Sequence, residues 1–266
     1  MLTFVVPVKS KSVASDWVKF SQLFERTLKS ICNQTDSNFK VVVVCHEIPD
    51  INYTCENIHF IHPDFQPPSK ENISPQEYFI NKRIDKGNKI KHGVAYASKK
   101  FNTDYVMLVD SDDFVSNKVV SFVNSSANKL PGWYVGNGYL SFSWKNVLVV
   151  TKKKFNYLCG SSVIVKPNLI KHFFDKDKIN LYFDHRLTTL DSNIELQKVP
   201  FPAGIYNIGN GENMNMSFQK VKKLNNHGNW ISKQSLKRLS SKFKNYRFRL
   251  ITPRIRKEFN FYQASN

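Results

Sequence analysis

The feature that most constrains this chain is an apolar run that stops at a cluster of carboxylates. Residues 105–109, Tyr-Val-Met-Leu-Val, form a short apolar segment of the kind that is typical of a buried strand. Three acids follow it: Asp110, Asp112 and Asp113. Carboxylates this close raise one another's pKa, so a neutralising cation makes such a cluster easier to tolerate. The alternative is an acidic turn in which Asp113 or Ser116 caps the next helix.

Two more strand patterns lie near the start of the chain. Residues 2–8 and 39–45 are almost entirely apolar, and residues 17–33 between them follow helical spacing, with Asp16 as the expected N-cap. This order of strand, helix and strand has the length of a βαβ crossover. Strands without polar alternation indicate a parallel sheet that is covered on both faces.

A second crossover leads to the acidic cluster. Residues 58–61 are a short strand candidate, residues 63–75 a polar loop, and helical spacing runs from Arg83 to Phe101. The carboxylates are therefore predicted at the carboxyl edge of a sheet, where open α/β folds bind ligands. Further on, residues 119–130 can form a helix, and residues 133–150 alternate in a way that favours antiparallel strands.

The positive charge is concentrated at one end of the sequence. Residues 217–266 contain 13 Lys and Arg and one acid, and they contribute +12 of the formal net charge of +18. We expect an anionic partner for this segment, which could be a membrane surface, a nucleic acid or a polyanionic acceptor. From Ser232 to Tyr246 the apolar residues fall on one helical face, which predicts a basic amphipathic helix that lies on an anionic membrane or packs on the rest of the chain.

The cysteines and the apolar runs bear on the cellular compartment. The four cysteines show no C-x-x-C spacing, which argues against zinc and favours a reducing compartment. The first residues lack the pattern of a signal peptide, and no run approaches the length of a membrane-spanning helix. We expect a cytoplasmic protein, or one peripheral to the inner face of a membrane.

The order of these parts resembles the glycosyltransferases of the GT-A fold, and it is most similar to bacterial members of glycosyltransferase family 2 that transfer a single sugar. The segments that carry the resemblance are residues 4–8, residues 41–45, the Lys86-Gly87-Asn88-Lys89 helix with Ala95, and residues 104–113. Within the last segment, Asp110-Ser111-Asp112 matches the family's Asp-x-Asp motif.

The resemblance implies a fold, a domain division and an activity. The fold is α/β, with a mainly parallel central sheet flanked by helices. Residues 1–216 would be the catalytic domain, with a nucleotide-binding half at 1–116 and an acceptor half at 117–216, and residues 217–266 a basic helical extension. The activity would be metal-dependent transfer of a single sugar from a nucleotide-diphosphate sugar to a glycan or lipid-linked glycan.

The same resemblance assigns a metal site. Mn²⁺ or Mg²⁺ on Asp110 and Asp112 would stabilise the diphosphate leaving group, with Asp112 as the more direct ligand and Asp110 also touching the donor. His227 could complete the metal shell, although a histidine in such a loop can also be a plain loop residue. Asp113 would touch the donor sugar or have a structural role.

Further donor contacts are predicted along the chain. They are Pro7, Glu47, Arg83, Lys86, Lys89 and Ser111. The three basic residues could bind a phosphate, or they could lie on a solvated helix face. Glu47 stands near the position where similar enzymes carry an acid that reads the base, and Pro7 would shape the loop under the nucleotide or be purely structural.

An inverting transfer also needs a base that accepts the proton of the attacking hydroxyl. Asp184 is the predicted base, with a helix N-cap as its alternative role and Asp191 in reserve. A downstream Gln-x-x-Arg-Trp motif is absent, so we do not expect a processive synthase. Residues 159–162 predict a tight turn near the donor or a packing turn.

Three other functions compete with this interpretation. A nucleic-acid-binding protein would stack bases on aromatic residues of the basic segment, among them Trp230, Phe243 and Phe248. A sugar nucleotidyltransferase would carry a glycine-rich loop after the first strand, but residues 8–12 contain no glycine. A metal-binding module without catalysis is the third alternative.

Overall fold

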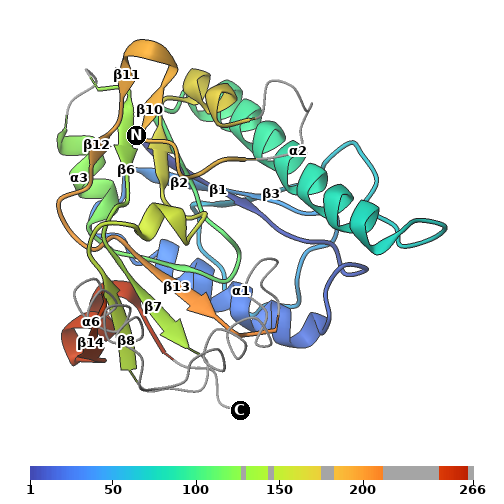
Figure 1. The fold of residues 1–266 in the computed structure, drawn as a ribbon, viewed down its shortest axis with the longest axis horizontal. Helices are drawn as coiled ribbons and strands as arrows, with labels where there is room; N and C mark the ends of the chain where they lie inside the picture. The colour runs from blue at the N-terminus through green and yellow to red at the C-terminus, as the bar shows by residue number, and fades with distance from the viewer. Residues whose placement is uncertain (127–129, 143–146, 175–182, 212–245, 263–266) are drawn as a thin grey trace, which may run out of the picture.

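The predicted parallel strands lie side by side in one seven-stranded sheet (Figure 1). The computed structural model describes residues 1–126, 130–142, 147–174, 183–211 and 246–262. In spatial order the strands of this sheet are β12 (Gln197–Lys198), β6 (Gly132–Tyr134), β9 (Val163–Val165), β4 (Tyr105–Leu108), β1 (Leu2–Pro7), β2 (Phe39–Val44) and β3 (Ile58–Ile61). Strand β1 pairs in parallel with β2 and β4, and β2 with β3, whereas β9 is antiparallel to β4 and β6. The mainly parallel central sheet is thus confirmed.

Two helices cover opposite faces of the parallel strands (Figure 1). Alternate residues of β1 point to opposite faces, so Phe4 and Val6 pack with α1 (Trp17–Ile31), while Val5 packs with α2 (Pro75–Phe101). Helix α2 comes so close to the sheet that a Cβ on Gly93 would lie 2.6 Å from Val5 Cγ1. Glycine at this position lets the helix lie against the strands, which brings its basic face to the sheet edge.

The helix ends follow local capping chemistry. Asp16 caps α1 by accepting a hydrogen bond from the backbone N–H of Lys19, as predicted. Helix α2 begins at Pro75, eight residues before the predicted start, because Ser74 and Glu77 form a capping box. The short α3 (Val119–Ser125) has no side-chain cap, so the alternative in which Asp113 or Ser116 caps it is wrong.

A second sheet of five strands lies beside the first. In spatial order its strands are β14 (Tyr246–Leu250), β8 (Val147–Thr151), β7 (Gly138–Phe142), β13 (Gly204–Ile208) and β5 (Phe114–Val115). Strands β7 and β8 are antiparallel, as their alternation predicted. The remaining elements are the pair β10 (Thr189–Leu190) and β11 (Ile194–Glu195), and the short 3₁₀ turns Phe155–Tyr157, Pro167–Phe173 and Asp191–Asn193. Because β5 directly follows the acidic cluster, this cluster lies where the two sheets meet.

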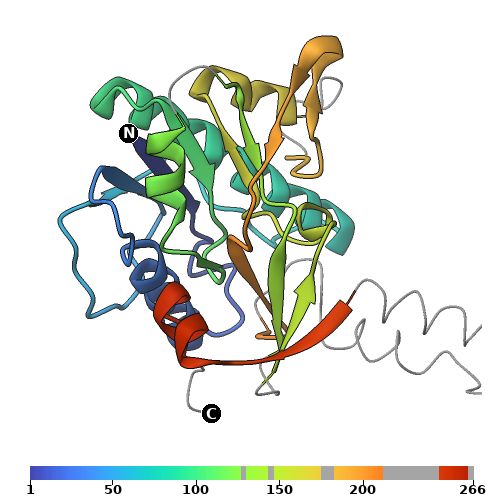
Figure 2. The ribbon, with the colours of Figure 1, turned by 90° about the vertical axis from the view of Figure 1, so that its left-hand side faces the viewer.

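The described part of the basic C-terminal segment is built into the domain. Strand β14 pairs with β8, and α6 (Pro253–Phe259) packs its apolar residues against Phe114 and Tyr139 (Figure 2). Tyr246 therefore belongs to a strand, and the predicted helix does not include it. The rest of that predicted helix, together with His227, lies outside the described residues, and the boundary at residues 216 and 217 stays a prediction.

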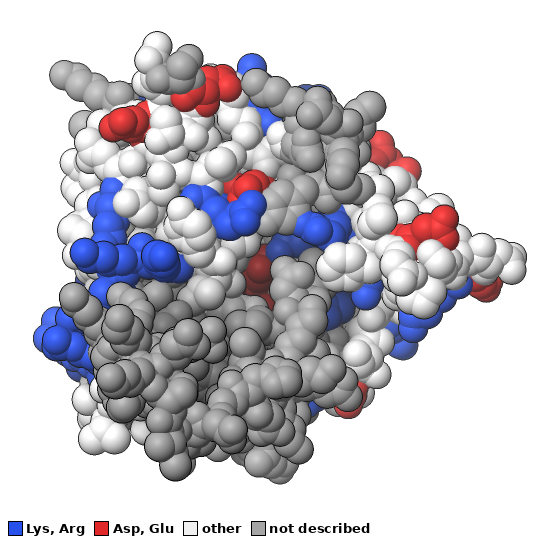
Figure 3. Space-filling view, viewed as in Figure 1, with Lys and Arg blue, Asp and Glu red and all other residues white. Residues whose placement is uncertain are grey.

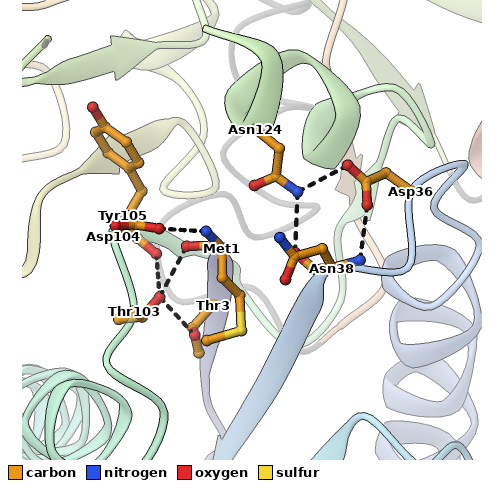
Figure 4. A network of polar contacts seen from close by, with 8 residues as sticks. All are labelled: Met1, Thr3, Asp36, Asn38, Thr103, Asp104, Tyr105 and Asn124. Atoms are coloured by element: carbon orange, nitrogen blue, oxygen red, sulfur yellow. Dashed lines mark hydrogen bonds and ion pairs between the residues drawn. The ribbon is translucent and has the colours of Figure 1, made fainter. Parts of the chain in front are cut away.

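A set of polar contacts holds the amino ends of the strands (Figure 4). The backbone nitrogen of Met1 contacts the Asp104 carboxylate, and Thr3 Oγ1 donates to Thr103 Oγ1 at 2.9 Å. On the α3 side, Asn124 Nδ2 donates to Asp36 Oδ2 at 2.9 Å. These contacts lie at the sheet edge opposite to the acidic cluster. In the described part of the chain, no helix is long and apolar enough to cross a membrane.

Candidate active site

A cleft of about 270 Å³ opens at the carboxyl ends of β1 and β4, where the sequence predicted a ligand site. Seven predicted site residues line it: Pro7, Arg83, Lys86, Lys89, Asp110, Ser111 and Asp112. In the face drawn in Figure 3, acidic side chains are visible inside a hollow, and Lys and Arg side chains lie around it. The cleft therefore combines carboxylates with cations, a combination suited to a ligand that carries both a metal and phosphates.

Asp110 is the carboxylate that contacts the basic wall of the cleft. Its Oδ1 accepts a hydrogen bond from Lys86 Nζ at 2.5 Å, and its side chain is about one quarter exposed. Burial disfavours the charged form of Lys86, but the charge of Asp110 and its hydrogen bond outweigh burial and raise the pKa of Lys86. Lys86 is therefore a permanent cation beside the acidic cluster.

Asp112 also lines the cleft and is held by an amide. Asn210 Nδ2 donates to Asp112 Oδ2 at 2.7 Å. Burial and then the charge of Asp110 raise the pKa of Asp112, while Asn210, Lys9 and Lys86 act in the opposite direction. The charged form of Asp112 is thus disfavoured by its surroundings, and a bound cation would relieve this cost.

Asp113 has turned away from the cleft into the protein. Its carboxyl is fully buried and accepts hydrogen bonds from Ser161 Oγ (2.6 Å), Cys159 Sγ (3.0 Å) and the backbone N–H of Asn207 (3.3 Å). Burial raises its pKa well above the ordinary value, and the charges of Asp112 and Asp110 raise it further. Asp113 thus has a structural role, which the sequence left open.

The turn at residues 159–162 supports both sides of the acidic cluster. Ser161 Oγ accepts a hydrogen bond from the backbone N–H of Asp110 at 2.8 Å and donates to Asp113. A Cβ on Gly160 would lie 2.7 Å from Asp110 Oδ2, so the absence of a side chain lets the turn approach this carboxylate. The sequence predicted a tight turn here, near the donor or as a packing turn, but it did not predict that Ser161 joins Asp110 to Asp113.

The opposite wall of the cleft is a basic stripe on α2. Lys82, Lys86 and Lys89 are spaced by four and three residues, so they lie on one helical face, and Arg83 also lines the cleft. Lys89 is fully buried, and its ammonium donates to Asp85 Oδ2 at 2.8 Å. The buried ammonium of Lys89 is thus less accessible to a ligand than that of Lys86, which leaves Lys82, Arg83 and Lys86 as the better candidates for a phosphate.

His185 is a cleft residue that the sequence did not single out. Its Nδ1 lies 2.6 Å from the backbone carbonyl oxygen of Asn156, and this acceptor requires the proton to be on Nδ1. Burial, the largest effect, lowers the pKa of His185 and favours the neutral ring, in which Nε2 carries the lone pair. The ring can therefore accept a proton inside the cleft.

Asp184 and Glu47 do not line the cleft. Arg186 holds the Asp184 carboxylate through two hydrogen bonds of 2.7 Å, and this pairing lowers the pKa of Asp184. Glu47 instead accepts a hydrogen bond from the backbone N–H of Lys11 at 3.0 Å. The reserve residue, Asp191, pairs with His172 at 2.9 Å. Among the described residues that line the cleft there is none of these three acids, and their predicted roles stay predictions.

Among the lining residues with ionisable side chains, the sequence analysis missed five, namely Lys9, Lys82, Asp85, His185 and Tyr206. Helical spacing from Lys86 could have identified Lys82, and Lys9 could have been found because it follows the first strand closely. His185 and Tyr206 carry no such local signal, because the second half of the chain brings them to the cleft.

The described residues fit a divalent cation with few protein ligands. No three His, Cys, Asp or Glu side chains within the described ranges converge as a metal cluster. Asp110 and Asp112 nevertheless supply carboxylate oxygens in one cleft, and Mg²⁺ in proteins is commonly bound by one or two carboxylates together with substrate phosphates and water. Both the donor type and the disfavoured charge on Asp112 are consistent with such an ion.

Comparison with known proteins gives structural likenesses only. The sequence matches no family model and no curated protein. Among solved structures, it is similar to S. aureus TarS in a crystal structure of residues 1–349 (12% identity, TM-score 0.40, 77% of this chain and 60% of that chain). The same fragment in complex with UDP-GlcNAc gives 12% identity, a TM-score of 0.41 and coverage of 82% and 61%.

A further TarS crystal structure is also similar, at 12% identity and a TM-score of 0.40, with coverage of 78% of this chain and 37% of that chain. The chain thus spans about three fifths of the 1–349 fragments and little more than a third of the longer one. At these TM-scores the likenesses support no conclusion about activity, substrate or partners.

Proposed function

We propose that this chain is a glycosyltransferase that moves a single sugar from a nucleotide-diphosphate sugar to a hydroxyl of a glycan or lipid-linked glycan. The observation that carries the proposal is one cleft in which Asp110 and Asp112 face the cations of α2. A diphosphate leaving group gains negative charge as the glycosidic bond breaks, and cations placed around it stabilise that charge.

Asp110 and Asp112 would hold Mn²⁺ or Mg²⁺ in this cleft. When bound, the ion would supply charge neutralisation for the diphosphate. Lys86 orients Asp110 through their hydrogen bond and adds a cation of its own. Asn210, which follows β13 in the sequence, orients Asp112 through a hydrogen bond of its own. Lys82 and Arg83 stand on the same wall as Lys86 and are the proposed phosphate contacts.

Proton removal from the acceptor is assigned to His185 in preference to Asp184. The acceptor hydroxyl gives its proton to His185 Nε2, its oxygen attacks the anomeric carbon, and the bond to the diphosphate oxygen breaks with inversion. His185 lines the cleft and has Nδ1–H fixed by Asn156, whereas the Asp184 carboxylate is held by Arg186 outside it.

Turnover of a donor panel tests the activity. UDP- and GDP-sugars, UDP-GlcNAc among them, are incubated with the full chain and either Mn²⁺ or EDTA, and nucleoside diphosphate release is followed by mass spectrometry. We expect metal-dependent release from at least one donor. No release from any donor, or equal release in EDTA, would contradict the proposal.

Two neighbouring variants test the choice of base. For the donor found in that panel, His185→Gln is expected to lower turnover about 100-fold, in line with the usual loss of a general base. Asp184→Asn is expected to keep most of the activity. A larger loss of turnover in Asp184→Asn than in His185→Gln would instead identify Asp184 as the base.

A further inference from the structure

The edge of the second sheet carries an exposed surface that combines apolar and cationic side chains. We define the β14 surface as the side chains of Arg247, Phe248, Arg249 and Leu250 on β14, together with the cations of α6, the helix that follows β14 closely in the sequence: Arg254, Arg256 and Lys257. Strand β14 pairs with β8 on one side and is the outermost strand of its sheet (Figure 2). It therefore presents one long edge away from the sheet.

The apolar side chains of this surface are unusually exposed for their size. Phe248 is 69% exposed and Leu250 is 72% exposed. Because side chains alternate along a strand, these two share one face, and Arg247 and Arg249 share the other. Single exposed hydrophobic residues are common on protein surfaces, but two on one edge strand, each beside an arginine, form a pattern.

The charge of the surface is strongly positive. All five of its cations, the four arginines and Lys257, are exposed. The only acid of the described segment 246–262 is Glu258, which is paired with Lys118 at 2.9 Å and accepts a hydrogen bond from Ser116 at 2.8 Å. Glu258 is therefore engaged inside the domain and does little to offset the exposed cations.

The surface is also held rigidly. Ile255, Phe259 and Phe261 are buried in a cluster with Phe114, and Asn260 Nδ2 donates to the Lys29 carbonyl at the end of α1. Thr252 caps α6 by accepting from the Ile255 N–H. The backbone of α6 is therefore ordered before binding, which lowers the cost of ordering this surface when a partner binds.

We propose that the β14 surface docks on an anionic lipid bilayer. Arginines at a membrane surface are attracted to anionic headgroups, while exposed Phe and Leu side chains enter the interface between headgroups and acyl chains. This inference concerns a surface apart from the cleft, and it does not depend on the proposed transferase activity.

Two other occupants fit the surface less well. A nucleic acid would be attracted to the arginines and could stack on Phe248, but it offers no partner for Leu250. A second copy that pairs strand to strand would bring the arginines of both β14 strands close together, and like charges across a strand pair are destabilising. An anionic bilayer that meets β14 at its outer edge can contact both kinds of side chain, because both faces of the strand border this edge.

Vesicle flotation of the full chain tests the cationic part. Flotation is expected with phosphatidylcholine vesicles that contain phosphatidylglycerol, and not with phosphatidylcholine alone. Charge reversal in Arg247→Glu/Arg249→Glu should lower binding at least about tenfold. The matched control Lys99→Glu/Lys100→Glu, on exposed residues of α2, makes the same charge change and should lower it less than about twofold. Equal flotation of wild type and the β14 variant would overturn the proposal.

The apolar part needs a separate variant. Phe248→Ser/Leu250→Ser should lower vesicle binding several-fold at high salt, where the arginine contribution is screened, and unchanged binding there would overturn the inference. Both side chains are largely exposed, so the thermal unfolding midpoint should stay at the wild-type value. Fluorescence anisotropy with a single-stranded oligonucleotide completes the test. Loss of oligonucleotide binding in the arginine variant with unchanged flotation would assign the surface to nucleic acid.

Discussion

The two sides of the acidic turn differ more than their sequence suggests. On the cleft side, Asp110 and Asp112 meet Lys86 and Asn210, which leaves carboxylate oxygens beside a cavity. On the inner side, the carboxyl of Asp113 accepts hydrogen bonds from two other segments of the chain, the turn with Cys159 and Ser161 and the strand with Asn207. Residues of one type, within four positions, therefore divide between a ligand site and the structure that holds it.

The largest expected effect is a loss of turnover in the variant Asp112→Asn. Loss of this charge should lower kcat about 1000-fold, a loss typical of removing a preorganised electrostatic group from an active site. The assay is donor turnover at saturating donor and Mn²⁺. Asp104→Asn is the matched control because Asp104 lies at the amino end of the same strand, at a partly exposed ion pair (Figure 4). A similar loss of turnover in both variants would show that the effect is not specific to the carboxylates of the cleft.

The next effect is on stability, and it belongs to the buried side. Asp113→Ala should lower the free energy of unfolding by about 3 kcal/mol, because the Ser161 hydroxyl and the Asn207 N–H lose their acceptor in a buried place. Urea unfolding measures this change. Asp112→Ala should cost less than about 1 kcal/mol, since it removes a charge whose burial is itself unfavourable. Equal costs would mean that both carboxylates are structural.

A smaller effect is expected on the basic wall. Lys86→Met should weaken binding of a nucleoside diphosphate about 30-fold, since it removes a charge-assisted contact and frees Asp110 to repel the phosphate. Titration calorimetry gives the dissociation constant. Lys99→Met, on an exposed part of the same helix, should leave that constant unchanged. If a nucleoside diphosphate binds Lys86→Met with the same dissociation constant as wild type, Lys86 is not a phosphate contact.

The smallest expected effect is on the pH dependence of the unfolding free energy. It should differ between wild type and Asp113→Asn, in which a neutral side chain replaces the carboxyl. The folded protein raises the pKa of Asp113 above its unfolded value, so folding favours the protonated form. As pH rises from the unfolded pKa of about 3.9 toward the raised folded pKa, wild type loses stability that Asp113→Asn, which does not titrate, keeps. The difference in unfolding free energy should therefore move in favour of the variant with rising pH. If rising pH instead changes this difference in favour of wild type, the pKa of Asp113 is lowered in the folded protein.

Much of the first sheet was predictable from local patterns. The apolar runs that became β1, β2, β3 and β4, and the helical spacing of α1, are signals that neighbouring residues carry. The early start of α2 was also readable, because Ser74 and Glu77 have the spacing of a capping box. These elements place Asp110 and Asp112 at the carboxyl edge.

Apart from the antiparallel pair of β7 and β8, the second sheet and the support of the site were not predictable in this way. Strand β14 pairs with β8 about a hundred residues earlier in the chain, and its alternation of Arg with Phe and Leu was assigned to a basic segment without a strand. Asp113 looked like a helix cap because acids in turns commonly cap helices. Its burial depends on Ser161 and Asn207, which only the tertiary fold brings to it.

Electron paramagnetic resonance of Mn²⁺ tests the central claim, that the cleft side of the acidic turn binds a metal together with a diphosphate. Wild type and Asp104→Asn should bind Mn²⁺ in the presence of a nucleoside diphosphate, and Asp112→Asn should not. Asp113→Asn should still bind, because Asp113 faces away from the cleft. Mn²⁺ binding by Asp112→Asn equal to that of wild type would contradict the account.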